Sequence, residues 1–151
     1  MTSTTSPEHE RFVRDSLWVA GSLGLVAVLF GSFGAHLLPE WLARQGLESE
    51  LIAKRLEQLE IAVRYNLFHA LAILALLAVA FSRPLRLLRC AWWCFTVGMV
   101  LFSGSLYALV LCNQPKFGMI TPLGGVALMV GWVFLVIAAR QRSDGNTGRA
   151  N

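Results

Sequence analysis

Four long apolar stretches dominate the sequence, at about residues 16–36, 63–82, 88–112 and 121–140. An apolar segment of about 20 residues is long enough to cross the hydrocarbon core of a bilayer as an α-helix. The composition agrees, because 56% of the residues are hydrophobic and only 15% are charged, whereas about a quarter of a soluble domain is charged. We therefore predict an all-α polytopic membrane protein, with four transmembrane helices in a compact left-handed bundle at residues 16–140.

The two ends of the chain are polar, and we expect both to be disordered, residues 1–15 as a cytoplasmic N-terminus and residues 141–151 as a cytoplasmic tail. Arg11 and Arg14, followed by an apolar stretch, also describe a secretory signal peptide. The stretch is longer than a usual signal core, however, and no clear small-x-small cleavage site follows it. A retained first span is therefore the better interpretation.

The segment between the first two spans predicts one further helix, which is amphipathic and covers about residues 49–62. After Pro39 and a connector at residues 40–46, Ser49 is expected to cap this helix, and apolar residues then recur at helical spacing. The opposite face carries Lys54, Glu57, Gln58 and Glu60. Such a helix would lie on the membrane surface or on the bundle and run directly into the second span. A helix that binds another protein is the alternative interpretation.

The basic residues predict how the chain is oriented in the membrane. With four spans, the two termini and the turn near Pro84 share one side, which carries eight of the 13 lysines and arginines. The opposite side carries five, offset by five glutamates. Because basic residues concentrate on the cytoplasmic side, we expect a cell (inner) membrane protein with both termini cytoplasmic. The basic residues lie in short blocks between apolar stretches, which argues against a nucleic-acid partner.

The three cysteines form no disulfide framework. Cys90 and Cys94 lie one helical turn apart at one end of the third span, and Cys112 lies at its other end. At about 1.5 Å per residue, Cys94 and Cys112 are roughly 27 Å apart, which is far more than a disulfide can bridge. We expect buried, unreactive thiols.

Polar residues of all four spans converge at one predicted depth, toward the outer leaflet, because successive spans alternate in direction. The members of this polar layer are His36, Arg64, Asn66, His69, Ser103, Ser105, Tyr107 and Thr121. Thr121 is also the expected N-cap of the fourth helix, followed by Pro122. We interpret the layer first as a packing network, because such side chains hydrogen-bond between helices in lipid. Small residues seven apart favour close packing in a left-handed bundle; they are Gly24 and Gly31, Gly98 and Ser105, and Gly124 and Gly131.

The alternative interpretation is that the polar layer lines a shallow ligand site open to the outside. His36 and His69 could bind a metal or haem, whereas Arg64 could hold an anionic head group, reach the interface or pair with Glu60. Two histidines without a carboxylate or thiol at ligand spacing are a weak metal signal, so we predict no metal and no other cofactor. No nucleophile–base pair is recognisable, and the span interiors lack Asp and Glu, which argues against an enzyme and against a proton-coupled pump.

Four sequence blocks, in order along the chain, resemble a known family. They are GSFGAH at 31–36, YNLFHA at 65–70, FSGSLY at 102–107 and ITPLGG at 120–125, the last followed by Gly131-Trp132. These blocks are similar to the signatures of the YgdD/YwdK-like membrane proteins, a domain-of-unknown-function family of small bacterial inner-membrane proteins with eukaryotic relatives. The resemblance covers about residues 17–138 and implies a four-helix membrane protein. It implies no activity and no catalytic residue.

Our functional hypothesis is a non-catalytic accessory or assembly subunit of a membrane complex. Its expected partners are the lipid bilayer and either other membrane-protein subunits or further copies of the chain. The small size, the Gly/Ala faces and the amphipathic helix motivate this hypothesis. The alternative is a small transporter or a lipid- or solute-binding protein with a pocket in the polar layer, and a membrane redox or metal enzyme that uses the histidines is a more distant third.

Overall fold

The computed structural model describes residues 6–80, 83 and 85–141. Within these ranges the chain forms six helices and no β-strand. The helices are α1 (Pro7–His36), α2 (Leu38–Arg44), α3 (Ser49–Val79), α4 (Leu85–Cys112), the 3-10 helix η1 (Pro115–Met119) and α5 (Thr121–Arg140). Four helical segments are long and apolar enough to cross a membrane, namely α1, α3, α4, and η1 with α5. The all-α fold with four spans is therefore confirmed.

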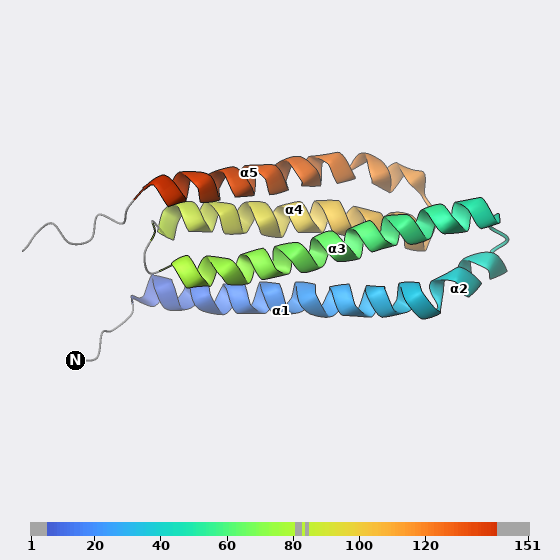
Figure 1. Cartoon of the computed structure of the whole chain (residues 1–151), viewed down its shortest axis with the longest axis horizontal. Coiled ribbons are helices and arrows are strands. Elements are labelled where there is room, and N and C mark those ends of the chain that lie inside the picture. The colour runs from blue at the N-terminus through green and yellow to red at the C-terminus, as the bar shows by residue number, and fades with distance from the viewer. Residues whose placement is uncertain (1–5, 81–82, 84, 142–151) are drawn as a thin grey trace, which may run out of the picture.

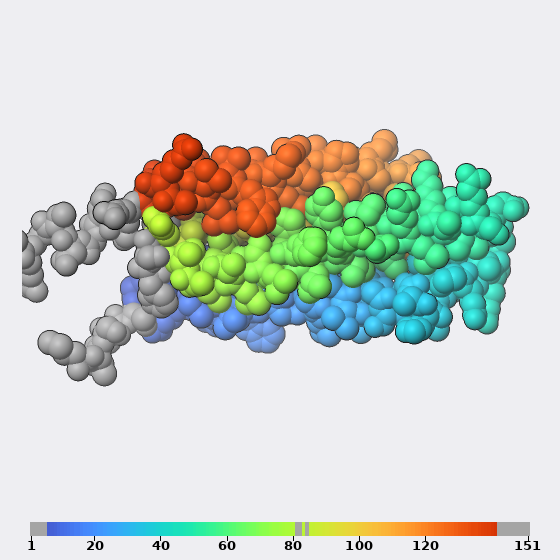
Figure 2. Space-filling view, viewed as in Figure 1, coloured from blue at the N-terminus to red at the C-terminus, as the bar shows by residue number. Residues whose placement is uncertain are grey.

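The four long helices run side by side along one axis, and the start of α1 lies at the same end as the end of α5 (Figure 1). α4 is the central helix, because it packs extensively on α5, on α3 and, more lightly, on α1. α1 packs mainly on α3. The backbone of α5 comes close only to α4 and η1 within the described ranges. Side chains fill the space between α3 and α5, so little of α4 is visible between these two helices on the face that Figure 2 shows.

Two apolar clusters fill the interior, one toward each end of the bundle. The cluster nearer the start of α1 is built around Phe95, Ile73 and Leu88, none of which is exposed. The cluster at the opposite end includes Leu38 and Leu42 of α2, which are also fully buried. The expected connector at residues 40–46 therefore contains most of a short helix that covers one end of the bundle. Pro39 lies in the first turn of α2, where its missing N–H costs no intrahelical hydrogen bond.

Glycines set the close approach of α4 and α5. A Cβ added to Gly98 would lie 2.6 Å from a methyl group of Leu128, and one added to Gly131 would lie 2.6 Å from the ring of Phe95. A Cβ at Gly124 would overlap the backbone of Phe102. These three glycines pack as expected from their spacing. Gly24 does not, because a Cβ there would meet no heavy atom within 4 Å.

The helix starts differ from the expected ones. α1 begins at Pro7, so residues 7–15, for which we expected disorder, are helical; Glu8 and Glu10 lie in its first turn, where acidic residues favour a helix, and Phe12 is buried. α3 begins at Ser49 and runs without a break, so the amphipathic helix and the second span form one helix, as expected. Its N-cap is Glu48, and that of α5 is Ile120, neither with a side-chain capping bond.

The predicted caps at Ser49 and Thr121 are therefore wrong by one residue, since each of these residues is the first one inside its helix. Parts of other predictions fall on residues 1–5, 81–82, 84 and 142–151, which lie outside the described ranges. These parts are the first residues of the N-terminal segment, the end of the second span, the turn at Pro84 and most of the C-terminal tail.

Candidate functional site

His69 lies in α3 with only 6% of its surface exposed, and both of its ring nitrogens have partners. Its Nδ1 lies 3.0 Å from the carbonyl oxygen of Tyr65, and its Nε2 lies 3.3 Å from Nε1 of Trp132 in α5. An indole N–H can only donate, so Nε2 of His69 accepts the hydrogen bond from Trp132. Nδ1 therefore carries the ring proton and donates a hydrogen bond to the carbonyl oxygen of Tyr65. In this arrangement the imidazole is neutral and offers no unpaired nitrogen to a metal or a haem.

Asn66 and Tyr107 form a second buried pair. Asn66 is 1% exposed, and its Nδ2 donates to the hydroxyl oxygen of Tyr107 at 3.1 Å. The ring of Tyr107 also stacks on Phe30 of α1, with 4.1 Å between the ring centroids. The pair thus joins α3 to α4 and brings α1 against the same aromatic ring. The Oδ1 atom of Asn66 has no hydrogen-bond partner among the described residues.

Two serines of α4 hold its neighbours on either side. The hydroxyl of Ser103 donates to the carbonyl oxygen of Ala62 in α3 at 2.8 Å. The hydroxyl of Ser105 donates to the carbonyl oxygen of Phe102 at 2.9 Å and lies 2.8 Å from the hydroxyl of Thr121 in α5. Because the single hydroxyl proton of Ser105 is used toward Phe102, Thr121 donates to Ser105. Ser105 thus joins α4 to the start of α5.

Two members of the predicted layer lie apart from these bonds. Arg64 is more than half exposed and pairs with Glu60 one turn earlier in α3. His36 is exposed at the C-terminal end of α1. The other six members each take part in a hydrogen bond that joins two helices, and they are Asn66, His69, Ser103, Ser105, Tyr107 and Thr121. The layer is thus a set of interhelical hydrogen bonds, whereas Arg64 and His36 lie on the outside of the bundle.

Arg55 is a buried polar residue for which the sequence predicted no role. It is only 4% exposed, and its Nε and Nη2 atoms donate to Oδ1 of Asn113 at 2.9 and 2.7 Å. Its Nη1 atom donates to Oε1 of Gln58 at 2.9 Å. Asn113 follows α4 with a φ of 49°, a left-handed conformation that asparagine tolerates better than most residues. Arg55 therefore fastens the amphipathic half of α3 to the turn after α4.

The sequence contains a signal for each of the two residues separately, but none for the contact between them. An asparagine directly after an apolar helix suggests a left-handed helix end, and an arginine in an amphipathic helix suggests an exposed side chain. The pairing of residues 58 positions apart follows only from the packing of α3 on α4.

Metal-ligating and thiol groups are dispersed. Within the part of the chain that the structure describes, no three His, Cys, Asp or Glu side chains gather in a way that could hold a metal ion. Cys90 and Cys94 are partly buried free thiols. Cys112 is exposed, contrary to our expectation of buried thiols, because it lies at the last residue of α4.

Comparison with known proteins gives the family of the chain. The family model described as "Protein of unknown function (DUF423)" matches residues 30–125. A UPF0382 membrane protein of Staphylococcus saprophyticus is 40% identical over 120 residues, which are 79% of this chain and 92% of the relative. The UPF0382 membrane protein YwdK of Bacillus subtilis is 40% identical over 117 residues, 76% of this chain and 87% of the relative.

The UPF0382 inner membrane protein YgdD of Escherichia coli K12 is 35% identical over 131 residues, which cover 83% of this chain and 89% of the relative. No solved structure matches the chain. The matched region contains the last turns of α1, all of α2, α3, α4 and η1, and the start of α5, and so includes the whole polar layer. The chain therefore belongs to the DUF423 family of UPF0382 membrane proteins, whose function is unknown.

Proposed function

We propose that the protein is a non-catalytic accessory or assembly subunit of a membrane complex, and that it joins the complex through the face of α1 that carries Gly21. A Cβ built on Gly21 or Gly24 would meet no heavy atom within 4 Å, whereas the glycines between α4 and α5 are tightly covered. Helices in lipid approach one another where their residues are small. An uncovered small-residue face on α1 is the observation that carries the proposal.

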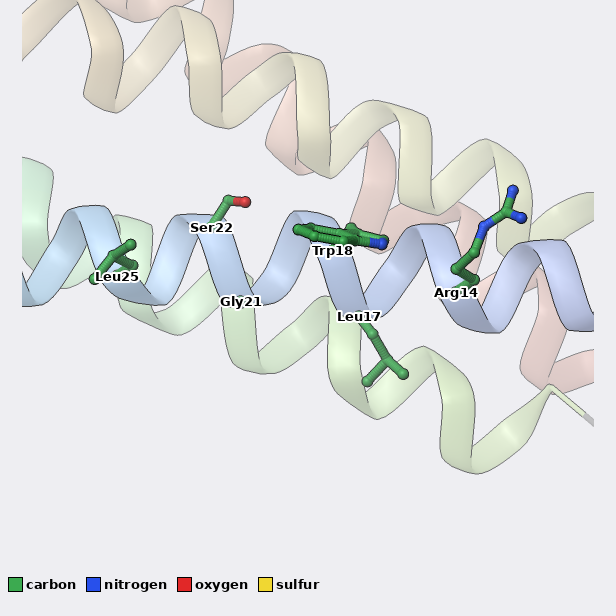
Figure 3. Close-up of a pocket in the computed structure, with 6 residues that line it drawn as sticks. All are labelled: Arg14, Leu17, Trp18, Gly21, Ser22 and Leu25. Carbon is green, nitrogen blue, oxygen red and sulfur yellow. The ribbon is translucent and has the colours of Figure 1, made fainter.

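The same face is hollowed into an open groove of about 390 Å³ (Figure 3). All of its lining residues belong to α1, and they are Arg14, Leu17, Trp18, Gly21, Ser22 and Leu25. Trp18 and Leu25 are 73% and 61% exposed and flank Gly21 along the helix. A helix of another subunit could lie across Gly21 and contact both large side chains. Arg14 at one end of the groove would remain near the membrane surface.

The structure gives less support to a transporter or solute-binding protein with a pocket in the polar layer. Six of the eight layer residues are engaged in bonds between helices, and both nitrogens of His69 are used. Arg64 is paired with Glu60 on the outside of α3. We also infer from the eight-to-five distribution of basic residues that both termini are cytoplasmic. α1 starts and α5 ends at the same end of the bundle, which supports placing both termini on one side of the membrane (Figure 1).

The test is the composition of the native particle after extraction in a mild detergent. We expect the natural chain to be recovered with other subunits at fixed stoichiometry, and Gly21→Leu to be recovered alone with unchanged helix content. Gly104→Leu is the matched control, because Gly104 lies on α4 and a Cβ there also meets no heavy atom within 4 Å. Recovery of the natural chain as a homogeneous species without other subunits would contradict the proposal.

A further inference from the structure

A second groove, of about 580 Å³, lies between the first half of α1 and the first half of α4. It carries both charged and aromatic groups, including Arg11, Asp15, Trp18, Arg89, Trp92 and Trp93. It differs from the groove over Gly21 because two helices line it, although Trp18 borders both. The mixture of two guanidinium groups, one carboxylate and three indoles distinguishes it from a surface that merely faces lipid chains.

We propose that this groove binds the head group of a zwitterionic aminophospholipid, with the phosphate between Arg11 and Arg89 and the primary ammonium against Asp15. The proposal concerns lipid binding and does not depend on the proposed function of the protein. The first observation that supports this proposal is the depth of the groove in the membrane. Arg11 and Asp15 lie at the polar start of α1, and Trp18 lies seven residues beyond Arg11, or about 10 Å farther into the apolar stretch. Tryptophans at this level are typical of the membrane interface, beside the glycerol and upper acyl region of a lipid.

The guanidinium of Arg89 is oriented by the chain and retains donors for a ligand. Its Nη2 donates to the backbone carbonyl oxygen of Glu8 at 3.1 Å. Its Nη1 lies 3.7 Å from the Glu8 carboxylate, which is beyond hydrogen-bonding distance, and that side chain is 72% exposed. A guanidinium has five N–H donors. A phosphate oxygen can therefore bond to Arg89 without displacing the backbone contact that holds it, and Arg11 adds a second positive charge.

The carboxylate in the groove selects among head groups. Asp15 lies 3.3 Å from Arg14, but both side chains are at least half exposed, and such a pair is weak. A lipid with a net negative charge and no amine could bond to the two arginines, but it would leave Asp15 and nearby Glu8 without a positive partner. A choline head group has no N–H to donate to Asp15. A phosphate combined with a primary ammonium matches the two arginines and the aspartate together, which is the composition of an ethanolamine head group.

The test uses the full chain, purified in detergent and equilibrated with equal amounts of phosphatidylethanolamine, phosphatidylglycerol and phosphatidylcholine of identical acyl chains. Native mass spectrometry then counts the lipids retained. We expect the natural chain to retain phosphatidylethanolamine about tenfold over the other two lipids. A tenfold preference corresponds to about 1.4 kcal/mol, which is no more than one hydrogen bond to a charged group contributes.

Three variants separate the head-group site from a general effect of charge. Arg11→Gln with Arg89→Gln should abolish the preference, whereas Arg86→Gln with Arg140→Gln, which removes the same charge outside the groove, should keep it. Asp15→Asn should move the preference to phosphatidylglycerol. The proposal is overturned if the natural chain shows no preference for phosphatidylethanolamine, if both double variants behave alike, or if Asp15→Asn leaves the selection unchanged. All five residues are exposed or half-buried, so the folded state should persist in each variant.

Discussion

Replacing Gly124 by alanine tests how α4 and α5 are held together. A Cβ at this position would overlap the backbone nitrogen of Phe102 and would lie 2.8 Å from its Cα and Cβ. Carbon atoms in favourable contact are about 3.5–4.0 Å apart. Because the obstacle is backbone, rotation of a side chain cannot relieve it, and α5 must move away from α4 by roughly 1 Å.

The expected cost follows from that displacement. A gap of about 0.5–1 Å removes a quarter to a half of the attraction in each contact that it opens. The displacement also loosens the close contacts at Gly98 and Gly131, and the backbone of α5 has no other long helix nearby within the described ranges. We therefore expect Gly124→Ala to lower the free energy of unfolding by about 1–3 kcal/mol, as overpacking does in other well-packed interiors.

The assay is reversible unfolding of the purified protein in mild detergent, titrated with a denaturing detergent and followed by far-ultraviolet circular dichroism. Gly104→Ala is the matched control, since it adds the same methyl group to α4 where no heavy atom lies within 4 Å. The control should be at least as stable as the natural chain, because alanine favours a helix over glycine by up to about 1 kcal/mol. Equal stability of the two alanine variants would refute the close approach at Gly124.

Three further outcomes are expected. In the same titration, Tyr107→Phe should lower the free energy of unfolding by about 1–3 kcal/mol, because it leaves the buried Nδ2 of Asn66 without its acceptor. Arg64→Ala should change it by less than about 1 kcal/mol, since the pair with Glu60 is exposed. In intact cells, a membrane-impermeant thiol reagent should label from outside a variant that keeps only Cys112. Labelling of the variants that keep only Cys90 or only Cys94 instead would contradict the inferred orientation.

The spans were predictable from the sequence because length and apolar composition act along one chain segment at a time. The fourth span illustrates this, since the expected residues 121–140 are those of α5. The start of α1 was not predictable in the same way. Residues 7–15 are polar enough to suggest disorder, but burial of Phe12 and the contact of Arg89 with Glu8 hold them in a helix. These contacts are tertiary and leave no local pattern.

For the polar layer, the depth of each residue in the membrane was predictable, but the rotation of each helix about its axis was not. Depth follows from counting residues along each span. Residues predicted to lie at the same depth are indeed bonded to each other, as Asn66 is to Tyr107 and Ser105 is to Thr121. Rotation of each helix about its axis decides which side chains face a neighbour, and a short polar block does not determine it. His36 for this reason lies outside the interhelical bonds although it belongs to the predicted layer.

The distribution of the interhelical bonds singles out α1 among the four spans. The bonds of the polar layer join α3 to α4, α3 to α5, and α4 to α5, and none of them reaches α1. α1 is held instead by apolar packing on α3, by the stack of Phe30 on Tyr107 and by the contact of Glu8 with Arg89. Apolar side chains can exchange a neighbouring helix for lipid at little cost, whereas buried polar groups cannot. It is therefore consistent that both grooves proposed for binding, to a partner helix and to a lipid head group, lie along α1.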